Sequence, residues 1–257
     1  MRAGTEEGVD AGELAAYLDR ELAVDRFRDY CPNGLQVAGD RPVRRLLAGV
    51  TASRALIEQA IARDADTLLV HHGYFWKGED PRVVGIKRDR LALLLGHGLS
   101  LLAYHLPLDA HPRWGNNVGL AEALGWAVEG GFAGDPPIAL RGRVPEPVSA
   151  EALADRIESV LGRRPLLIPG GGHLVGTLGW CTGAAQDGIE EAAALGLDAF
   201  ISGEISERTV HFAREAGIHY FAAGHHATET FGVKALAAHL AERFGLDWSY
   251  AELDNPV

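Results

Sequence analysis

Apolar residues recur along this chain at two spacings, which predict alternating helices and strands. Leu14, Leu18 and Leu22 lie at helical spacing and predict a helix near the N-terminus. Short apolar runs and longer periodic segments then alternate. The predicted order is strand 44–51, helix 55–64, strand 66–70, helix 87–98, strand 99–104 and helix 118–125. Ser53 is a suitable N-cap for the first of these helices, and Gly125 is a suitable end for the last.

The second half of the chain repeats this order. It predicts strand 174–182, helix 188–196, strand 198–202, helix 206–217, strand 218–224, helix 229–245 and a last strand within 246–253. Alternating strands and helices are typical of parallel sheets covered by helices. The predicted fold is therefore α/β, with two related α/β lobes that arise from an internal duplication.

The boundary between the lobes is predicted from glycine and proline content. The motifs GDPP and VPEP follow the last helix of the first half, and a boundary near 126–135 fits them. We therefore expect a first lobe at 1–130 and a second lobe at 131–257.

The duplication also predicts corresponding strand ends in the two halves. The pairs are Thr51 with Thr182, His71-His72 with Gly203-Glu204, and His105 and Asp109 with His225 and Glu229. Because ligands bind beyond the carboxyl ends of parallel strands, we expect these residues to form the functional site.

The chemistry of these strand ends indicates a metal site without sulfur ligands. The candidate residues are His71, His72, His105, Asp109, His111, Gly203, Glu204, His225, His226 and Glu229. Such nitrogen and oxygen donors suit zinc, iron, manganese, nickel or cobalt. Their number exceeds the three protein ligands of a single catalytic zinc, so we expect two divalent metal ions. Asp109 and Glu229 are the favoured bridging ligands, because a carboxylate has two oxygens.

The adjacent histidines of the VHHG motif need a separate explanation, because neighbouring strand residues point to opposite faces. We expect His71 and His72 to diverge just before Gly73, so that each binds a different ion. His105 is expected beside the ligands, as a hydrogen-bond partner or proton donor. It is grouped with Glu204 as a candidate catalytic residue. His97, His173, His211, His219 and His239 are expected to lie outside the site.

Composition and charge narrow the classes of function. The 257-residue chain has a formal net charge of −11 and no cluster of basic residues, so it carries no nucleic-acid signal. It contains no apolar run that could span a membrane, and its opening MRAGTEEGVDAGE does not resemble a secretory signal. We expect a cytoplasmic protein in which Cys31 and Cys181 are simple thiols.

Five motifs together resemble the Nif-three-like proteins, also described as homologues of type 2 GTP cyclohydrolase I. They are CPNGLQVAG, VHHGYFWKG, YHLPLDAHPRWGNN, DAFISGEISE and GHHATE. The resemblance implies a dinuclear metal site between two α/β lobes, in a homohexamer of the short bacterial form. It implies the ligands His71, His72, Asp109, His225 and Glu229.

The resemblance also implies a hydrolase that acts on a nucleotide-like or other small molecule through a metal-bound hydroxide. Hydrolytic opening of the guanine imidazole ring of GTP is the reaction that the resemblance suggests. Two alternatives stay open: a metal-handling protein that stores, delivers or inserts the ion, and a hexameric interaction scaffold with structural metal.

Overall fold

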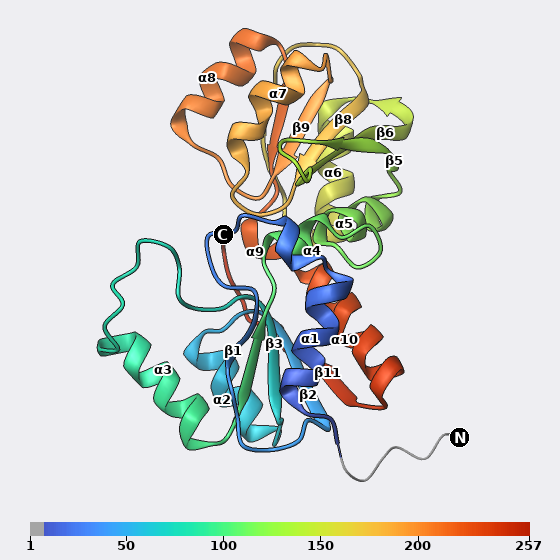
Figure 1. Cartoon of the computed structure of the whole chain (residues 1–257). Coiled ribbons are helices and arrows are strands. Elements are labelled where there is room, and N and C mark those ends of the chain that lie inside the picture. Colours follow the sequence, from blue (N-terminus) through green and yellow to red (C-terminus); the bar gives the residue numbers. More distant parts are fainter. Residues whose placement is uncertain (1–7) are drawn as a thin grey trace. The chain divides into compact units, whose positions relative to one another are not determined.

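The computed structural model describes residues 8–257, which form two compact units (Figure 1). Unit 1 contains the described residues up to Leu108 together with Gly232–Asp254. Unit 2 contains Asp109–Phe231 and Asn255–Val257. The units therefore differ from the contiguous lobes 1–130 and 131–257 expected from the sequence. The reason is that the C-terminal strand pairs with a strand of the first half.

Unit 1 is built around a five-stranded sheet. In chain order its elements are α1 (Ala11–Glu21), η1 (Val24–Arg26), β1 (Gly34–Val37), β2 (Arg45–Thr51), α2 (Arg54–Ala62), β3 (Thr67–His72), α3 (Gly85–Gly96), β4 (Ser100–Ala103), most of α10 (Thr230–Phe244) and β11 (Asp247–Tyr250). The strand order is β1-β4-β3-β2-β11. β11, β2, β3 and β4 are parallel, whereas β1 is antiparallel to β4.

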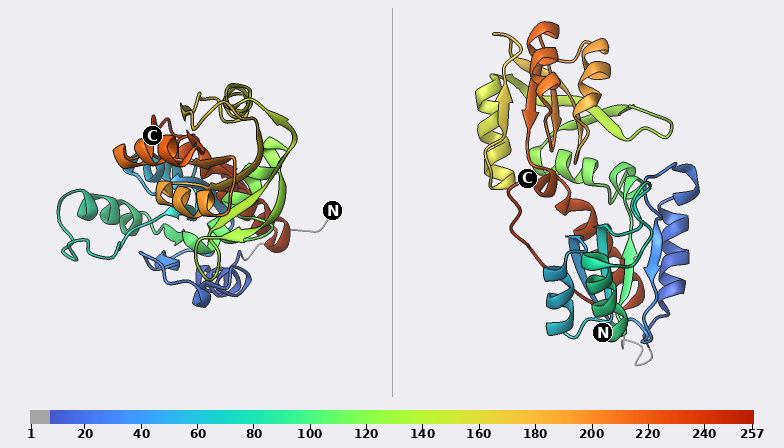
Figure 2. Two further views of the ribbon diagram at one scale, coloured as in Figure 1. Left: turned by 90° about the horizontal axis from the view of Figure 1, so that it is seen from above. Right: turned by 90° about the vertical axis from the view of Figure 1, so that its left-hand side faces the viewer.

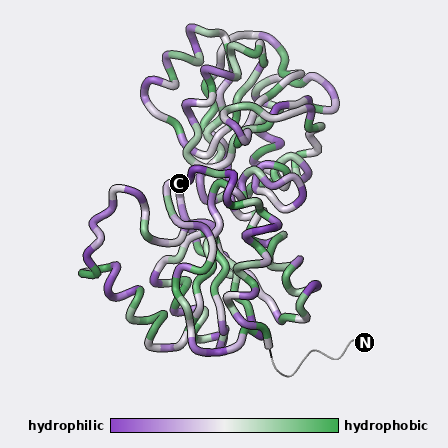
Figure 3. The backbone as a smooth tube through the Cα atoms, viewed as in Figure 1, coloured by the Kyte–Doolittle hydropathy of each residue, from purple (hydrophilic) through white to green (hydrophobic). Residues whose placement is uncertain are grey.

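Helices cover both faces of this sheet. In Figures 1 and 2, α2 lies on one side of the strands and α1 on the other. The α2 face buries Leu47, Leu68 and Leu101 of successive strands together with Leu56 and Leu94 of the helices. The central strands are coloured mainly as hydrophobic in Figure 3, as expected for strands buried on both faces.

The predicted N-cap of α2 is confirmed, and α1 has a cap of the same kind. Ser53 Oγ accepts a hydrogen bond from Leu56 N, which satisfies an amide of the first turn of α2. Asp10 caps α1 in the same way, by accepting from Gly12 N and Glu13 N.

Unit 2 contains a six-stranded sheet of order β5-β6-β8-β9-β10-β7. In chain order its elements are α4 (Leu106–Ala110, which begins in unit 1), α5 (Asn116–Leu124), β5 (Ala127–Phe132), β6 (Ala139–Val148), α6 (Ala150–Leu161), β7 (Leu166–Ile168), β8 (Val175–Cys181), η2 (Gln186–Gly188), α7 (Ile189–Ala194), β9 (Ala199–Ser202), α8 (Glu207–Ala216), β10 (His219–Ala222) and α9 (His225–Thr228).

Alternate residues of the unit 2 strands pack into two different hydrophobic cores, one on each face of the sheet. Trp180, Ile201 and Phe221 pack in a cluster with α5 and α6. Phe200 and Tyr220, one position away along the same strands, pack in a cluster with α7 and α8. This alternation gives three layers, because successive side chains of a strand point to opposite faces.

Both sheets are mixed, so the expectation of parallel sheets holds for the central strands and not for β1, β5, β6 and β7. The segment that the glycines and prolines marked as a boundary forms the antiparallel strands β5 and β6 of unit 2. β6 is also antiparallel to β8, with a register shift between Arg143 and Val148. Pro145 and Pro147 lie within this shift, where a missing amide donor is tolerated.

The two units share the pairing of their central strands. β8, β9 and β10 are parallel in this order, as β2, β3 and β4 are, and each third strand has an antiparallel neighbour. Asp66 Oδ2 accepts hydrogen bonds from Arg44 N and Arg45 N where β2 starts. Asp198 Oδ2 accepts from Gly176 N and Thr177 N at the corresponding place in β8. This repeated arrangement supports the proposed duplication.

The strand register shifts two of the predicted correspondences by one residue. With His71-His72 aligned to Gly203-Glu204, Thr51 aligns with Gly183 instead of Thr182. Thr67 pairs with Ser100 in unit 1, and Ala199 pairs with His219 in unit 2. Counting forward from Ser100 and His219 therefore aligns His105 with Gly224 instead of His225.

Within residues 8–257, the structure contains no helix that combines the length and the apolar character required to cross a membrane.

We predict that Asp198→Ala lowers the free energy of unfolding by about 1–2 kcal/mol, because hydrogen bonds to a partly exposed carboxylate are lost. Burial opposes ionisation of Asp198, but the amides of Thr177 and Gly176 outweigh it and lower its pKa. The stabilisation should therefore be complete above the unfolded pKa of about 3.9 and should disappear as pH falls through the lower folded value. Urea unfolding of the wild type and of Asp198→Ala at several pH values measures this difference in the free energy of unfolding.

The matched control is Asp187→Ala, which removes an exposed ion pair with Arg208. Its effect on stability should stay below about 1 kcal/mol. Equal effects of the two substitutions would contradict the role of Asp198.

Candidate functional site

His71 and His72 form the end of β3 in unit 1, as predicted. His71 is fully buried, and its Nδ1 lies 2.8 Å from the carbonyl oxygen of Tyr104. Because a carbonyl only accepts, Nδ1 carries the proton and Nε2 carries the lone pair. This is the arrangement of a metal-ligating histidine, whose other nitrogen donates to a protein oxygen.

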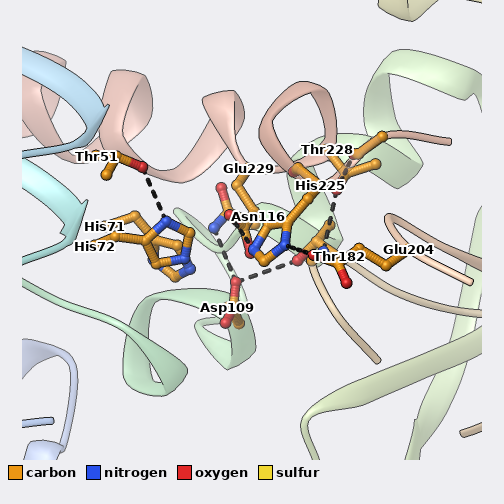
Figure 4. Close-up of polar contacts among 12 residues, drawn as sticks. Thr51, His71, His72, Asp109, Asn116, Thr182, Glu204, His225, Thr228 and Glu229 are labelled. Atoms are coloured by element: carbon orange, nitrogen blue, oxygen red, sulfur yellow. Dashed lines mark hydrogen bonds and ion pairs between the residues drawn. The ribbon is translucent and has the colours of Figure 1, made fainter. Parts of the chain in front are cut away.

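His72 is oriented by a residue of β2, the strand on the other side of β3 from the one that orients His71. Its Nδ1 lies 3.1 Å from Thr51 Oγ1 at the end of β2 (Figure 4). The centroids of the two imidazole rings are 4.6 Å apart, with a 50° angle between the planes. The rings therefore lie close together and do not diverge to opposite faces of the strand. Their Nδ1 atoms are held by partners on opposite sides of β3, which gives each ring its own orientation.

His105 follows β4 and joins the same group of rings. Its centroid lies 5.0 Å from that of His71 and 5.7 Å from that of His72. One donor atom from each of these three histidines lies within 4.8 Å of the others, a spacing that suits a metal ion. Unit 1 alone thus assembles three imidazoles.

The buried carboxylate of Asp29 orients the imidazole of His105. Asp29 Oδ1 lies 2.7 Å from His105 Nδ1, and the Asp29 side chain is only 4% exposed. Asp29 Oδ2 accepts from Leu106 N and from Asn33 Nδ2, while Asn33 Oδ1 accepts from His105 N. Burial opposes ionisation of Asp29, but hydrogen bonds from His105 and Asn33 outweigh it and lower its pKa. The Asp29–His105 pair is therefore suited to proton transfer, or to holding the His105 imidazole in one orientation.

Trp76 packs edge-on against the same ring. Its centroid lies 5.1 Å from that of His105, at an interplanar angle of 86°. Trp76 therefore forms part of the immediate surroundings of His105.

Asp109 is the buried carboxylate of α4 in unit 2. Its Oδ1 accepts hydrogen bonds from Asn116 Nδ2 at 2.8 Å and from Thr182 Oγ1 at 3.2 Å (Figure 4). Asn117 links the two segments, because its Nδ2 donates to Asp109 O and its Oδ1 accepts from Thr182 N. This network positions Asp109 at the end of β8.

His225 lies between two carboxylates of unit 2. Glu204 Oε1 lies 2.6 Å from its Nδ1, and Glu229 Oε2 lies 3.2 Å from its Nε2. Burial alone would lower the pKa of His225, but Glu229 and Glu204 raise it to about 9. Glu204 thereby directs the opposite edge of the ring toward Glu229.

Glycine permits the close approach of these side chains. Gly183 has a φ of +72°, and a Cβ there would lie 2.2 Å from Glu229 Oε1. Gly183 N also donates to Thr228 Oγ1, which ties this turn to α9. A side chain at position 183 would therefore displace Glu229.

The donors of unit 2 fit a divalent cation. Asp109 and Glu229 are both at least 95% buried and each offers an oxygen within 4.8 Å of the other. Two carboxylates in such surroundings need positive charge or a proton nearby. A divalent cation meets this need, and oxygen with imidazole nitrogen matches the predicted donor set.

The histidines expected outside the site have local partners. His97 Nδ1 donates to Leu93 O, His211 contacts Glu207, and His239 contacts Tyr17. His111, one of the initial candidates, stacks on Trp114 at 4.5 Å.

Cys31 and Cys181 are both free thiols, as predicted. Burial raises the pKa of Cys31 to about 12 and raises that of Cys181 further. Both side chains are therefore neutral near pH 7.

The sequence interpretation missed the residues that position two of the candidate side chains, His105 and Asp109. Asp29 and Asn33 position His105, and Asn116 and Asn117 position Asp109. Three of these lie in motifs already noticed, CPNGLQVAG and YHLPLDAHPRWGNN, where the asparagines were the available signal.

These features define a two-unit α/β protein whose strand ends carry histidines and carboxylates suited to a metal site. A family model described as Duf34/NIF3 (NGG1p interacting factor 3) matches residues 9–255. The chain belongs to this family. A relative from Vibrio cholerae, named "GTP cyclohydrolase 1 type 2 homolog", is 54% identical over 248 residues, which is 95% of this chain and 98% of the relative.

Solved structures share the fold. One, described as protein ybgI of unknown function, has a TM-score of 0.94 and 46% identity, covering 97% of this chain and 100% of that one. Another, TTHA1606 from Thermus thermophilus, has a TM-score of 0.86 and 38% identity with the same coverage of both chains.

We predict that Glu204→Gln weakens metal binding by about 10–100-fold, because the carboxylate that orients His225 loses its charge. Competition with a chromogenic chelator measures the affinity. The matched control is Glu207→Gln, because Glu207 contacts His211 on an exposed helix surface. Equal affinities for the Glu204 variant and the wild type would contradict this role.

Proposed function

We propose that this protein is a metal-dependent hydrolase that acts on a nucleotide-like small molecule. The proposed ligands of two divalent ions are His71 and His72 of unit 1 and Asp109, His225 and Glu229 of unit 2. The buried imidazole and carboxylate donors within each unit support this proposal. When bound, such ions lower the pKa of water and polarise a substrate oxygen.

The side chains around the proposed ligands have distinct roles. Tyr104 O keeps the proton of His71 on Nδ1, so that Nε2 is the coordinating atom. Glu204 orients His225, and Thr182 with Asn116 orients Asp109. His71, Asp109 and His225 are thus each held by a hydrogen bond to a group outside the proposed ligand set, which reduces the reorganisation that binding requires.

The His105–Asp29 pair is the observation that favours catalysis most. A site that only stores an ion needs ligands, whereas hydrolysis also needs a group that moves protons. His105 lies in ring contact with His71 and His72, and the buried carboxylate of Asp29 accepts a hydrogen bond from its Nδ1. His105 Nε2 is therefore the atom that we assign to proton transfer.

The names of the relatives suggest the first substrates to test. GTP cyclohydrolase chemistry would open the guanine imidazole ring and release C8 as formate. The same set of groups also suits hydrolysis of a phosphoester, so a panel of nucleotides and phosphoesters belongs with GTP.

A metal-handling role is the second candidate. The side chains of His225 and Glu204 are 25% and 36% exposed, which would allow an ion to exchange with solvent. Such a protein would transfer its ion to an apo-acceptor and would not depend on the His105–Asp29 pair.

We predict that Asp29→Asn lowers kcat by about 100-fold, because general acid–base groups contribute about 10²–10⁴-fold. Metal content, measured by mass spectrometry, should stay unchanged. The assay uses protein purified without chelator and the panel of GTP, nucleotides and phosphoesters. The control is Asp25→Asn, which changes an aspartate of η1 near Asp29 in the sequence. Absence of turnover by the fully metal-loaded wild type would overturn the hydrolase proposal.

We also propose that the chain assembles as a homo-oligomer, with the homohexamer as the form implied by the resemblance. Val83, Val84 and Ile86 at the start of α3 are 52%, 60% and 71% exposed. These three exposed aliphatic side chains lie close together in the sequence, and exposed apolar patches mark surfaces that bind a partner.

We predict that Ile86→Asp reduces the assembly mass, because a charge would be buried in the subunit contact. Light scattering after size-exclusion chromatography measures this mass. Leu195→Asp in unit 2, where Leu195 is 43% exposed, is the control and should leave the mass unchanged. An unchanged mass for Ile86→Asp would exclude this surface as the contact.

A further inference from the structure

Unit 2 contains an open pocket beside the carboxylate that orients His225. Its volume is about 590 Å³. Arg163 and Arg164 line it on one side, and Gly203, Glu204 and Ile205 line it on another. Pro256 and Val257 also contribute, and His226 N donates to Val257 O. The pocket therefore reaches directly from two arginines to Glu204.

The two arginines differ in their surroundings. Arg164 forms ion pairs with Glu151, Asp155 and Glu158, three residues of α6. Arg163 forms no ion pair with a carboxylate among residues 8–257. In a protein of net charge −11, a half-buried cation without a carboxylate partner needs an explanation.

Backbone geometry holds Arg163 at the pocket wall. α6 ends at Gly162, whose φ of +71° turns the chain so that Arg163 follows directly. The guanidinium packs against Gly224, where a Cβ would lie 2.6 Å from its Nη1. Gly224 has a φ of +103° and precedes His225. The absence of a side chain at Gly224 thus gives Arg163 a defined position next to the predicted ligand.

We propose that this pocket binds the phosphate group of a phosphorylated substrate through Arg163. A guanidinium presents a planar fork of donors that matches phosphate oxygens, and it remains charged at all physiological pH values. The Glu204 carboxylate is engaged with His225 Nδ1 and does not neutralise Arg163. The inference rests on the proposed function, because it names the substrate class of that reaction.

The other walls suit the organic part of such a substrate. Leu166 is 54% exposed at the pocket, and Pro165 and Ile205 add apolar surface. A ring or a sugar would pack there while the phosphate contacts Arg163. The pocket adjoins the Nδ1 edge of His225 through Glu204, so a bound substrate would lie beside this imidazole.

The test is isothermal titration calorimetry with inorganic triphosphate, using the full chain with its native metal. Arg163→Gln should weaken binding by about tenfold or more, because charge-assisted hydrogen bonds are lost. Arg164→Gln is the matched control, which should change the affinity by less than about twofold because its exposed ion pairs contribute little. Arg163→Lys keeps the charge and should lose less than Arg163→Gln. Thermal melts establish that each variant is folded.

Three results would overturn the proposal: no binding by the wild type, equal loss in the Arg163 and Arg164 variants, or no loss in either Arg163 variant. Calorimetry measures binding and does not require turnover. Failure of the pocket proposal can therefore be distinguished from failure of the hydrolase proposal. One result would support the pocket proposal and reject the hydrolase proposal. It is triphosphate binding that depends on Arg163, together with no turnover of any nucleotide or phosphoester. Turnover of phosphorylated substrates with an unchanged kcat/KM in Arg163→Gln would reject the pocket alone.

Discussion

Parallel pairing of three central strands is the constraint on which each unit of this protein depends. It brings the carboxyl ends of β2, β3 and β4 to one edge in unit 1, and those of β8, β9 and β10 to one edge in unit 2. Asp66 and Asp198 hold the opposite ends by accepting backbone amides of the first strand. Side chains that are distant in the sequence therefore meet where these strands end.

The histidines at these edges are oriented by oxygen atoms of the protein. Tyr104 O, Thr51 Oγ1, Asp29 Oδ1 and Glu204 Oε1 each contact an Nδ1, those of His71, His72, His105 and His225 respectively. A fixed orientation matters more than the number of imidazoles, since a rotating ring would bind an ion weakly. The partners also differ in charge. The carbonyl at His71 fixes the proton on Nδ1, whereas the two carboxylates around His225 favour its protonated form.

Much of the architecture was predictable from local patterns. The helices and central strands were found because their apolar residues have clear periods and their starts carry capping residues such as Ser53. The hairpin of β5 and β6 was missed, because its exposed residues and prolines resemble a linker. The compact units also differed from the contiguous halves, because β11 pairs with β2 and no local signal reveals a pairing between such distant segments.

The sequence by itself determined which residues are chemically suited to the site: histidines and carboxylates that directly follow apolar strands, with glycine beside them. Only the tertiary structure decided how these side chains are held. Asp29 lies far from His105 in the chain, and Thr182 lies far from Asp109, yet each pair is in hydrogen-bond contact. The same is true of Arg163 and Arg164, which are neighbours in the sequence but differ in the carboxylates that surround them. The physical reason is that hydrogen bonds and burial depend on neighbours in space, which the order of residues does not specify.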